Sequence, residues 1–99
     1  MTGDLAEDDL WELAGYVKGG EHRHEVFRYL AQNGPAIPSK VAEETNRRPQ
    51  RVYDAQSELE KRELIELKVP DEQKKGRLRA LTETGEQVWN FMGEQGMVD

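Results

Sequence analysis

Hydrophobic residues recur three and four positions apart along most of this chain, which is the period of an amphipathic helix. The first such stretch covers residues 7–18, and its apolar side chains are expected on one face: Leu10, Trp11, Leu13, Ala14 and Val17. Acidic residues open this stretch, where the helix dipole favours negative charge, and two glycines follow it. Residues 21–32 repeat the period and end at an Asn-Gly pair. The first third of the chain is therefore predicted to form two helices.

Two further helical stretches lie close together in the middle of the chain. Pro38 suits the first position of a short helix over 38–45, and Pro49 suits the first position of a longer helix over 49–62. Asn46, in the short segment between them, tolerates the left-handed conformation of a sharp turn. The side chains of the longer helix that are expected to point inward are Val52, Ala55, Gln56 and Leu59. This spacing predicts a helix-turn-helix unit.

The period changes to two after this unit, as expected of β-strands. Apolar residues alternate with charged ones in 65–69 and again in 77–81, and the segment between them is hydrophilic and contains a proline and a glycine. A β-hairpin with a long loop is predicted here. Thr82 then suits the N-cap of a last helix that runs through Val88, Trp89 and Met92.

The order of these elements predicts an α+β, mainly α fold: a winged helix-turn-helix whose wing is the two-stranded hairpin, with flanking terminal helices. The length of 99 residues fits one small domain, 1–99. Within it we expect an N-terminal helix in 1–20, the winged core in 21–81, and a C-terminal helix and tail in 82–99.

Four segments carry a resemblance to a known family: GYVKGGEHRHEVFRYLAQNG, PSKVAEETN, RVYDAQSELEKRELIE and DEQKKGRLRALTETGEQV. Spanning residues from about 16 to 90, they resemble winged helix-turn-helix transcription regulators that are common in archaea, of the MarR and ArsR type. The resemblance implies a regulator of transcription that binds double-stranded DNA. The helix 49–62 would enter the major groove, and the basic wing 68–79 would lie on the backbone or in the minor groove. It identifies neither an operator nor an effector ligand.

The chain departs from the family pattern at several positions around the helix-turn-helix. The family usually has glycine at the positions of Asn46 and Glu63, a buried aliphatic residue at Arg47, and a serine or threonine cap at Arg48. An arginine that replaces a core residue is expected to extend to the surface. We therefore expect Arg47 to add a phosphate contact rather than to loosen the turn.

Charge is distributed unevenly along the chain, whose formal net charge is −6. Residues 47–81 hold ten bases and seven acids, whereas 1–20 holds five acids and one base and 82–99 holds four acids and no base. A basic centre between acidic ends favours one surface that faces a polyanion. The chain has no cysteine and no long apolar run, so we expect a cytoplasmic protein without disulfides, thiolate metal sites or membrane spans.

Candidate DNA contacts come from the second helix of the unit and from the wing. Arg51 can pair with guanine, Gln50 can pair with adenine, and Asp54 can hold Arg51 in place or accept a hydrogen bond from cytosine. The alternative for Arg51 and Asp54 is a surface salt bridge. The predicted DNA-binding residues are Lys40, Arg47, Arg48, Gln50, Arg51, Tyr53 and Asp54, with Lys74, Lys75, Arg77 and Arg79 from the wing.

The remaining candidates concern partners and chemistry. Apolar residues of the terminal helices predict a homodimer interface: Leu10, Trp11, Leu13, Trp89 and Met92. His22 and His24, two positions apart, are expected to be solvated and to point outward rather than to bind a metal. No enzyme activity and no cofactor are indicated. A winged helix that binds other proteins instead of DNA remains the alternative function.

Overall fold

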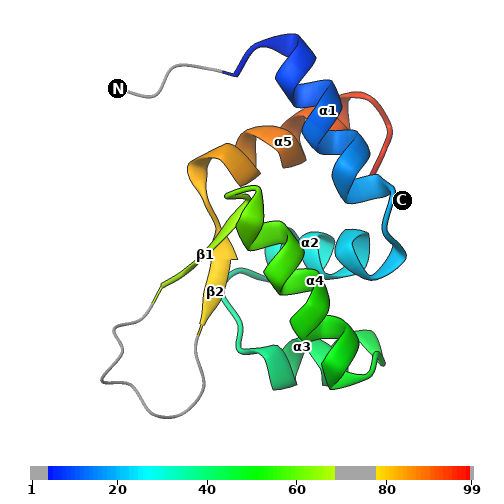
Figure 1. Ribbon diagram of the computed structural model, residues 1–99, viewed down its shortest axis with the longest axis vertical. Helices are drawn as coiled ribbons and strands as arrows, with labels where there is room; N and C mark the ends of the chain where they lie inside the picture. Colours follow the sequence, from blue (N-terminus) through cyan, green and yellow to red (C-terminus); the bar gives the residue numbers. More distant parts are fainter. Residues whose placement is uncertain (1–4, 69–77, 99) are drawn as a thin grey trace.

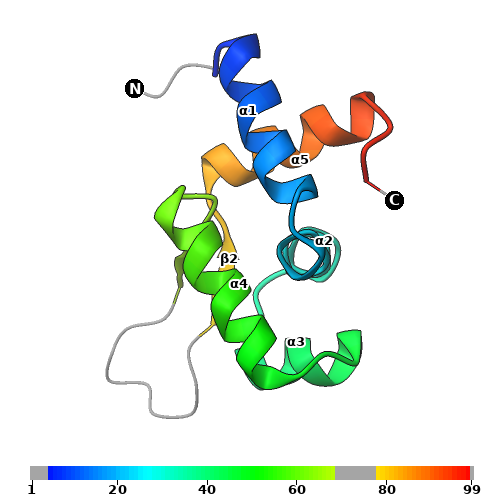
Figure 2. The same ribbon diagram turned by 45° about the vertical axis from the view of Figure 1, so that its right-hand side comes forward.

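A computed structural model describes residues 5–68 and 78–98. Within them the chain forms five helices and two strands: α1 (Glu7–Lys18), α2 (Glu21–Asn33), α3 (Pro38–Thr45), α4 (Pro49–Lys61), β1 (Ile65–Leu67), β2 (Arg79–Leu81) and α5 (Glu83–Glu94). Helices α1 and α5 lie together at one end of the molecule, α3 and the start of α4 lie at the other, and α2 lies between (Figure 1). The turned view keeps this arrangement (Figure 2). This order of elements confirms the prediction from the sequence.

The helix boundaries follow from local chemistry. Pro38 and Pro49 both stand in the first turn of their helices, where a missing N–H costs no hydrogen bond. Asn46 ends α3 with φ 59° and ψ 40°, which is the left-handed conformation expected of it. Gly34 ends α2 with φ 84° and ψ −168°, a region that is accessible essentially to glycine alone. Thr82 caps α5, since its hydroxyl accepts a hydrogen bond from the Gly85 N–H at 2.9 Å.

One apolar core joins the helices to the hairpin. Its largest fully buried side chains are Val17, Val26, Phe27, Leu30, Val41, Val52, Leu59, Leu64, Val88 and Met92. Complete burial of such side chains contributes about 1.5–3 kcal/mol each. The four residues predicted to point inward from α4 are all buried. Gln56 is the polar one among them, and its side-chain oxygen and nitrogen have no hydrogen-bond partner among the described residues.

Helix α1 keeps part of its predicted apolar face outside the core. Ala14 and Val17 are buried, but Trp11 is 46% exposed and packs against Phe91 edge to face, with ring centroids 4.9 Å apart. Leu10 and Leu13 are half-buried. Because α1 lies at one end of the molecule, only part of its surface is covered, mainly by α5 and α2. The apolar side chains of α1 therefore occupy a wider face of the helix than this chain alone buries.

The hairpin is antiparallel and pairs Ile65 with Leu81 and Leu67 with Arg79. Its described strands are shorter than the predicted 65–69 and 77–81, and Val69 and Arg77 lie outside the described residues. Ala36, in the connection before α3, adds an isolated bridge to the sheet: its N–H donates to the Arg79 carbonyl at 3.1 Å and its carbonyl accepts from the Arg79 N–H at 3.0 Å. The sequence did not predict this bridge, because a single residue cannot show the alternation that marks a strand.

The exit from α4 is closed by hydrogen bonds to the start of α5. Glu63 has φ 59°, and the Leu64 N–H returns to the Leu59 carbonyl at 3.0 Å. Thr82 donates from its hydroxyl to the Glu63 carbonyl at 2.7 Å and from its N–H to the Leu64 carbonyl at 3.0 Å. Thr82 therefore both caps α5 and holds the end of β2 to the turn after α4.

Candidate nucleic-acid interface

The first turns of α4 present a polar, exposed face. Gln50, Arg51 and Asp54 are exposed, and Tyr53 beside them is 52% exposed. Val52, which is fully buried, sets the rotation of the helix about its axis. The predicted orientation of these side chains is therefore confirmed. Their contact with DNA stays a prediction.

Asp54 is engaged by a different residue from the one expected. The amide nitrogen of Gln50 donates to Asp54 Oδ1 at 3.0 Å, one helical turn away. The salt bridge between Arg51 and Asp54, which was the alternative to a DNA contact, is not among the ion pairs of the described residues, and within these residues the Arg51 guanidinium has no partner. Arg51 thus remains available to an external acceptor.

Arg48 is exposed at the N-cap of α4. Its backbone carbonyl accepts from the N–H groups of Arg51 at 2.9 Å and Val52 at 3.2 Å, which starts the helix. Among residues 5–68 and 78–98, its guanidinium contacts no recorded partner. A cation in this position stands at the positive end of the helix dipole, and both attract phosphate.

Lys40 is exposed on α3 and pairs with Glu44 at 3.4 Å, one turn away on the same helix. The Glu44 carboxylate also accepts from the Tyr29 hydroxyl at 3.2 Å. Desolvation is the main cause, and this hydrogen bond the second, of a pKa for Tyr29 above its usual value of 10.0. An exposed pair of this kind contributes at most about 1 kcal/mol, so Lys40 can exchange Glu44 for another anion.

Arg47 does not extend to the outer surface as predicted. Its side chain is only 20% exposed and turns toward the start of α2. Its Nη1 lies 2.9 Å from His22 Nδ1 and 3.3 Å from Glu21 Oε2. The prediction assumed that the guanidinium of Arg47 would extend out of a buried position into solvent. Here the half-buried His22 supplies an acceptor inside the fold instead.

The wing residues divide into one that is described and three that are not. Arg79 lies at the base of the hairpin and is 19% exposed, and its Nε donates to Glu60 Oε2 of α4 at 2.6 Å. Its guanidinium is thus turned to α4, although the sequence placed it with the outward wing cations. Lys74, Lys75 and Arg77 lie outside the described residues.

The two histidines differ from the expectation. His22 contacts Arg47, and His24 is half-buried with its Nε2 shielded from solvent and without a recorded partner in the described part of the chain. Burial, assisted by the charges of Lys18 and Arg28, lowers the pKa of His24 below 6.5. The prediction of an outward, solvated side chain is therefore wrong for His24. Within 5–68 and 78–98 no group of three or more His, Asp or Glu residues is arranged to hold a metal ion.

A polar cluster that the sequence did not predict contacts the C-terminal half of α4. The Tyr16 hydroxyl donates to the Glu58 carbonyl at 3.2 Å, and Arg23 Nη1 donates to the Glu58 carboxylate at 2.9 Å. The guanidinium carbons of Arg23 and Arg62 each lie 4.1 Å from the centroid of the Tyr16 ring, within the range of a cation–π contact. These contacts join α4 to the end of α1 and the start of α2.

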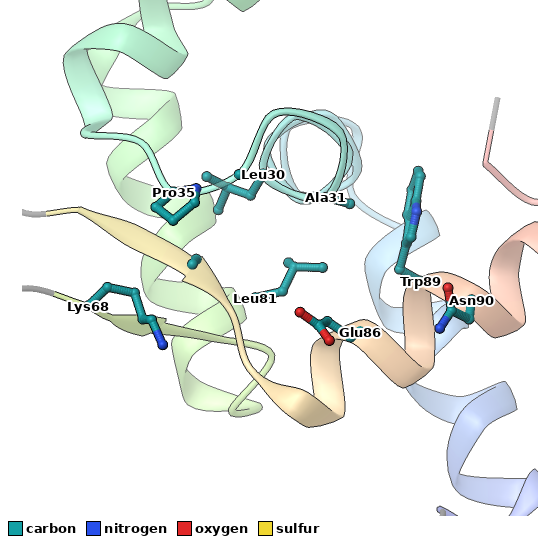
Figure 3. Close-up of a pocket in the computed structure, with 10 residues that line it drawn as sticks. Leu30, Ala31, Pro35, Lys68, Leu81, Glu86, Trp89 and Asn90 are labelled. Atoms are coloured by element: carbon teal, nitrogen blue, oxygen red, sulfur yellow. The ribbon is translucent and has the colours of Figure 1, made fainter.

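A hollow of about 400 Å³ lies away from this face, between α2, the hairpin and α5. Figure 3 shows Leu30, Pro35 and Leu81 on one side of it and Trp89 on the other, with Lys68 and Glu86 at its margins. None of its described lining residues comes from α4. It is therefore separate from the exposed face that carries Arg48 and Arg51.

The described helices contain no segment long and apolar enough to cross a membrane. No protein-family model and no curated protein matches this chain. Solved structures do match it. A double-mutant form of ZitR from Lactococcus lactis is 22% identical with a TM-score of 0.69, covering 78% of this chain and 52% of its own. A MarR family regulator from Neisseria meningitidis is 22% identical with a TM-score of 0.70, covering 90% of this chain and 63% of its own.

NadR in complex with 4-hydroxyphenylacetate is 18% identical with a TM-score of 0.69, covering 96% of this chain and 77% of its own. The chain thus spans about half to two thirds of the length of the first two solved proteins. At these identities the likeness establishes the fold, which is the winged helix-turn-helix of MarR-type proteins with a mainly helical α+β architecture.

Proposed function

We propose that this protein is a transcription regulator that binds double-stranded DNA and places α4 in the major groove. One observation carries the proposal: Arg48, Gln50 and Arg51 are exposed together at the start of α4, and both guanidinium groups lack a recorded partner among the described residues. The N-terminal residues of the second helix of a helix-turn-helix are those that contact base edges. The fold that it shares with transcriptional regulators supports this assignment.

The exposed side chains divide by the acceptors that they suit. Arg51 can make two hydrogen bonds to guanine, and Gln50 can make two to adenine while its amide is oriented by Asp54. Arg48 and Lys40 suit phosphates, which position the protein without reading sequence. Lys74, Lys75 and Arg77 add positive charge to the wing and are assigned to the DNA backbone or the minor groove. No residue is given a catalytic role.

The proposal includes a homodimer joined by the terminal helices. Half-buried or exposed apolar residues remain on this end of the molecule: Leu10, Trp11, Leu13 and Trp89. Met92, also assigned to the interface from the sequence, is fully buried within the single chain and belongs to its own core. The terminal helices and the start of α4 lie at opposite ends of the molecule (Figure 1). A dimer formed through the former leaves both copies of α4 free to reach two half-sites about 34 Å apart.

Fluorescence anisotropy of a labelled mixed-sequence duplex at two salt concentrations tests DNA binding. We expect the wild-type protein to bind at low salt and to lose affinity at high salt, with about 0.9 log units of affinity per log unit of salt for each phosphate contact. The Arg48→Ala/Arg51→Ala variant should lose binding while its circular dichroism spectrum stays unchanged.

The matched control removes two positive charges elsewhere. In the Arg28→Ala/Lys61→Ala variant the net charge changes by the same amount, but the altered residues lie on α2 and at the far end of α4. This variant should keep most of the affinity. Equal loss in both variants would mean that overall charge, rather than the start of α4, governs binding. A folded wild-type protein that does not bind at low salt would favour the protein-interaction module instead.

A further inference from the structure

Two neighbouring arginines in the turn between α3 and α4 face in opposite directions. Arg48 is exposed at the N-cap of α4, whereas Arg47 is 20% exposed and directed to the start of α2. The backbone around them is closely specified: Asn46 is left-handed, and the Arg47 N–H donates to the Ala42 carbonyl at 3.0 Å. We therefore ask whether the contact of Arg47 with α2 influences the orientation of Arg48.

Two residues of α2 contact Arg47, and His22 is the less exposed of them. A guanidinium group only donates hydrogen bonds, so in this contact His22 Nδ1, at 2.9 Å, is the acceptor. Glu21 lies 3.3 Å from the same nitrogen, but its side chain is 79% exposed, and a pair with so solvated a partner contributes little. His22 is thus the partner that decides where Arg47 points.

We propose that Arg47 is a positioning residue: it ties the turn between α3 and α4 to α2 through His22, so that Arg48 and the first turn of α4 are presented to DNA at a fixed angle. Arg47 itself does not contact phosphate. This inference rests on the proposed DNA-binding function. It gives α2, which carries none of the predicted DNA contacts, a part in shaping the DNA-binding surface.

The salt dependence of binding separates this role from a direct contact. A residue that contacts phosphate contributes about 0.9 to the slope of log affinity against log salt, and its removal lowers that slope. A positioning residue changes the affinity of the folded protein and leaves the slope as it was. A residue that serves only stability changes the folded fraction, but it does not change the affinity of each folded molecule.

Four single variants form the test, on the same mixed-sequence duplex over a salt series. Arg47→Met keeps the unbranched stem without the donor, and His22→Leu removes the acceptor. We expect each to weaken binding about three- to tenfold per folded molecule with an unchanged salt slope. His22→Asn keeps an acceptor close to the position of Nδ1 and should bind like the wild type. Arg48→Met is the matched control and should lower the slope by about 0.9.

Amide hydrogen exchange adds a measurement that needs no DNA. The N–H groups of Arg51 and Val52 bond to the Arg48 carbonyl and report on the first turn of α4. In Arg47→Met and His22→Leu their exchange should accelerate about fivefold or more, whereas in His22→Asn and Arg48→Met it should stay near the wild-type rate.

Either of two outcomes overturns the inference. A slope that falls by about 0.9 in Arg47→Met would make Arg47 a phosphate contact. Affinity and exchange rates that both equal those of the wild type in Arg47→Met would leave Arg47 with no positioning role. If the wild-type protein binds no duplex, the proposed function fails, and the exchange rates still decide whether Arg47 holds the turn.

Discussion

At the scale of single residues, Glu63 stands in a backbone conformation that its side chain disfavours. It follows α4 with φ 59°, and its N–H and the next one close the helix end on Glu60 and Leu59. Left-handed conformation costs an L-residue with a Cβ roughly 1–2 kcal/mol, whereas glycine adopts it freely. The regulators that the sequence resembles were expected to carry glycine here, and the positive φ supplies the physical reason.

Replacing Glu63 by glycine should therefore stabilise the protein. The relief of strain exceeds the extra flexibility that glycine gives the unfolded chain, so we expect a gain of about 0.5–1 kcal/mol and a rise in Tm of a few degrees. Thermal unfolding followed by circular dichroism measures it. Glu63→Ala is the control, because it removes the carboxylate but keeps the Cβ, and it should give little or no gain. A Glu63→Gly variant no more stable than Glu63→Ala would show that strain at this residue is negligible.

The same scale shows which side chains the sequence could not place. Arg47 and His22 are 25 positions apart, and only the packing of α2 against the helix-turn-helix brings Nη1 within 2.9 Å of Nδ1. Arg79 and Glu60 meet in the same way at 2.6 Å. Periodicity states which face of an element a residue occupies, but not which distant residue it meets. Both arginines were therefore predicted to face DNA, although each has an internal partner.

At the scale of elements, prediction succeeded where many residues share one period. The buried face of α4 was identified correctly, because Val52, Ala55, Gln56 and Leu59 repeat at helical spacing and Pro49 marks the start. The short hairpin and the bridge at Ala36 offer only a few residues each, and their extent depends on tertiary hydrogen bonds. The exposed half of α4, and with it the candidate DNA-binding face, followed from the buried half.

The junction of α5 with the rest of the molecule depends on close approach at Gly85. A Cβ at this position would overlap the Leu64 carbonyl oxygen and lie 3.3 Å from the Leu81 Cβ. The obstructing atom belongs to the backbone, so it cannot rotate away. We expect Gly85→Ala to destabilise the protein by about 1–3 kcal/mol, measured as a lower urea midpoint.

Gly93, also in α5, provides the matched control. A Cβ there meets no atom within 4 Å. Since alanine has the higher helix propensity, Gly93→Ala should stabilise the protein by about 0.5–1 kcal/mol. The two glycine-to-alanine changes in one helix are therefore expected to act in opposite directions. A Gly85→Ala variant as stable as the wild type would mean that α5 can shift away from Leu64.

At the scale of the whole molecule, the exposed arginines at the start of α4 lie at the opposite end from the acidic and apolar residues of α1. The terminal helices carry acidic residues in their first turns and an exposed Trp11, whereas Arg48 and Arg51 lie at the start of α4. Negative charge near the candidate DNA-binding face would repel phosphates. The acids that lie there, Asp54 and Glu44, are engaged by Gln50 and Lys40. The same separation leaves the apolar residues of α1 free to contact a second copy while DNA is bound.

Trp11 is therefore the residue on which the proposed dimer can be tested. It is 46% exposed, and Tyr53 on α4 is similarly exposed at 52%, so the two aromatic residues form a matched pair on different faces. Light scattering of the wild-type protein at micromolar concentration should give twice the chain mass of 11.4 kDa. Trp11→Glu should shift the mass to that of the monomer, because it places a charge in an apolar contact. Tyr53→Glu should leave the dimer intact.

The two variants also separate assembly from DNA contact. Trp11→Glu should weaken binding to a duplex because one α4 instead of two engages it, yet a monomer retains the face formed by Arg48, Gln50 and Arg51. Tyr53→Glu should weaken binding in the dimeric state, because it adds negative charge beside that face. A wild-type protein that is monomeric at high micromolar concentration would refute the dimer and leave a single α4 to account for all DNA binding.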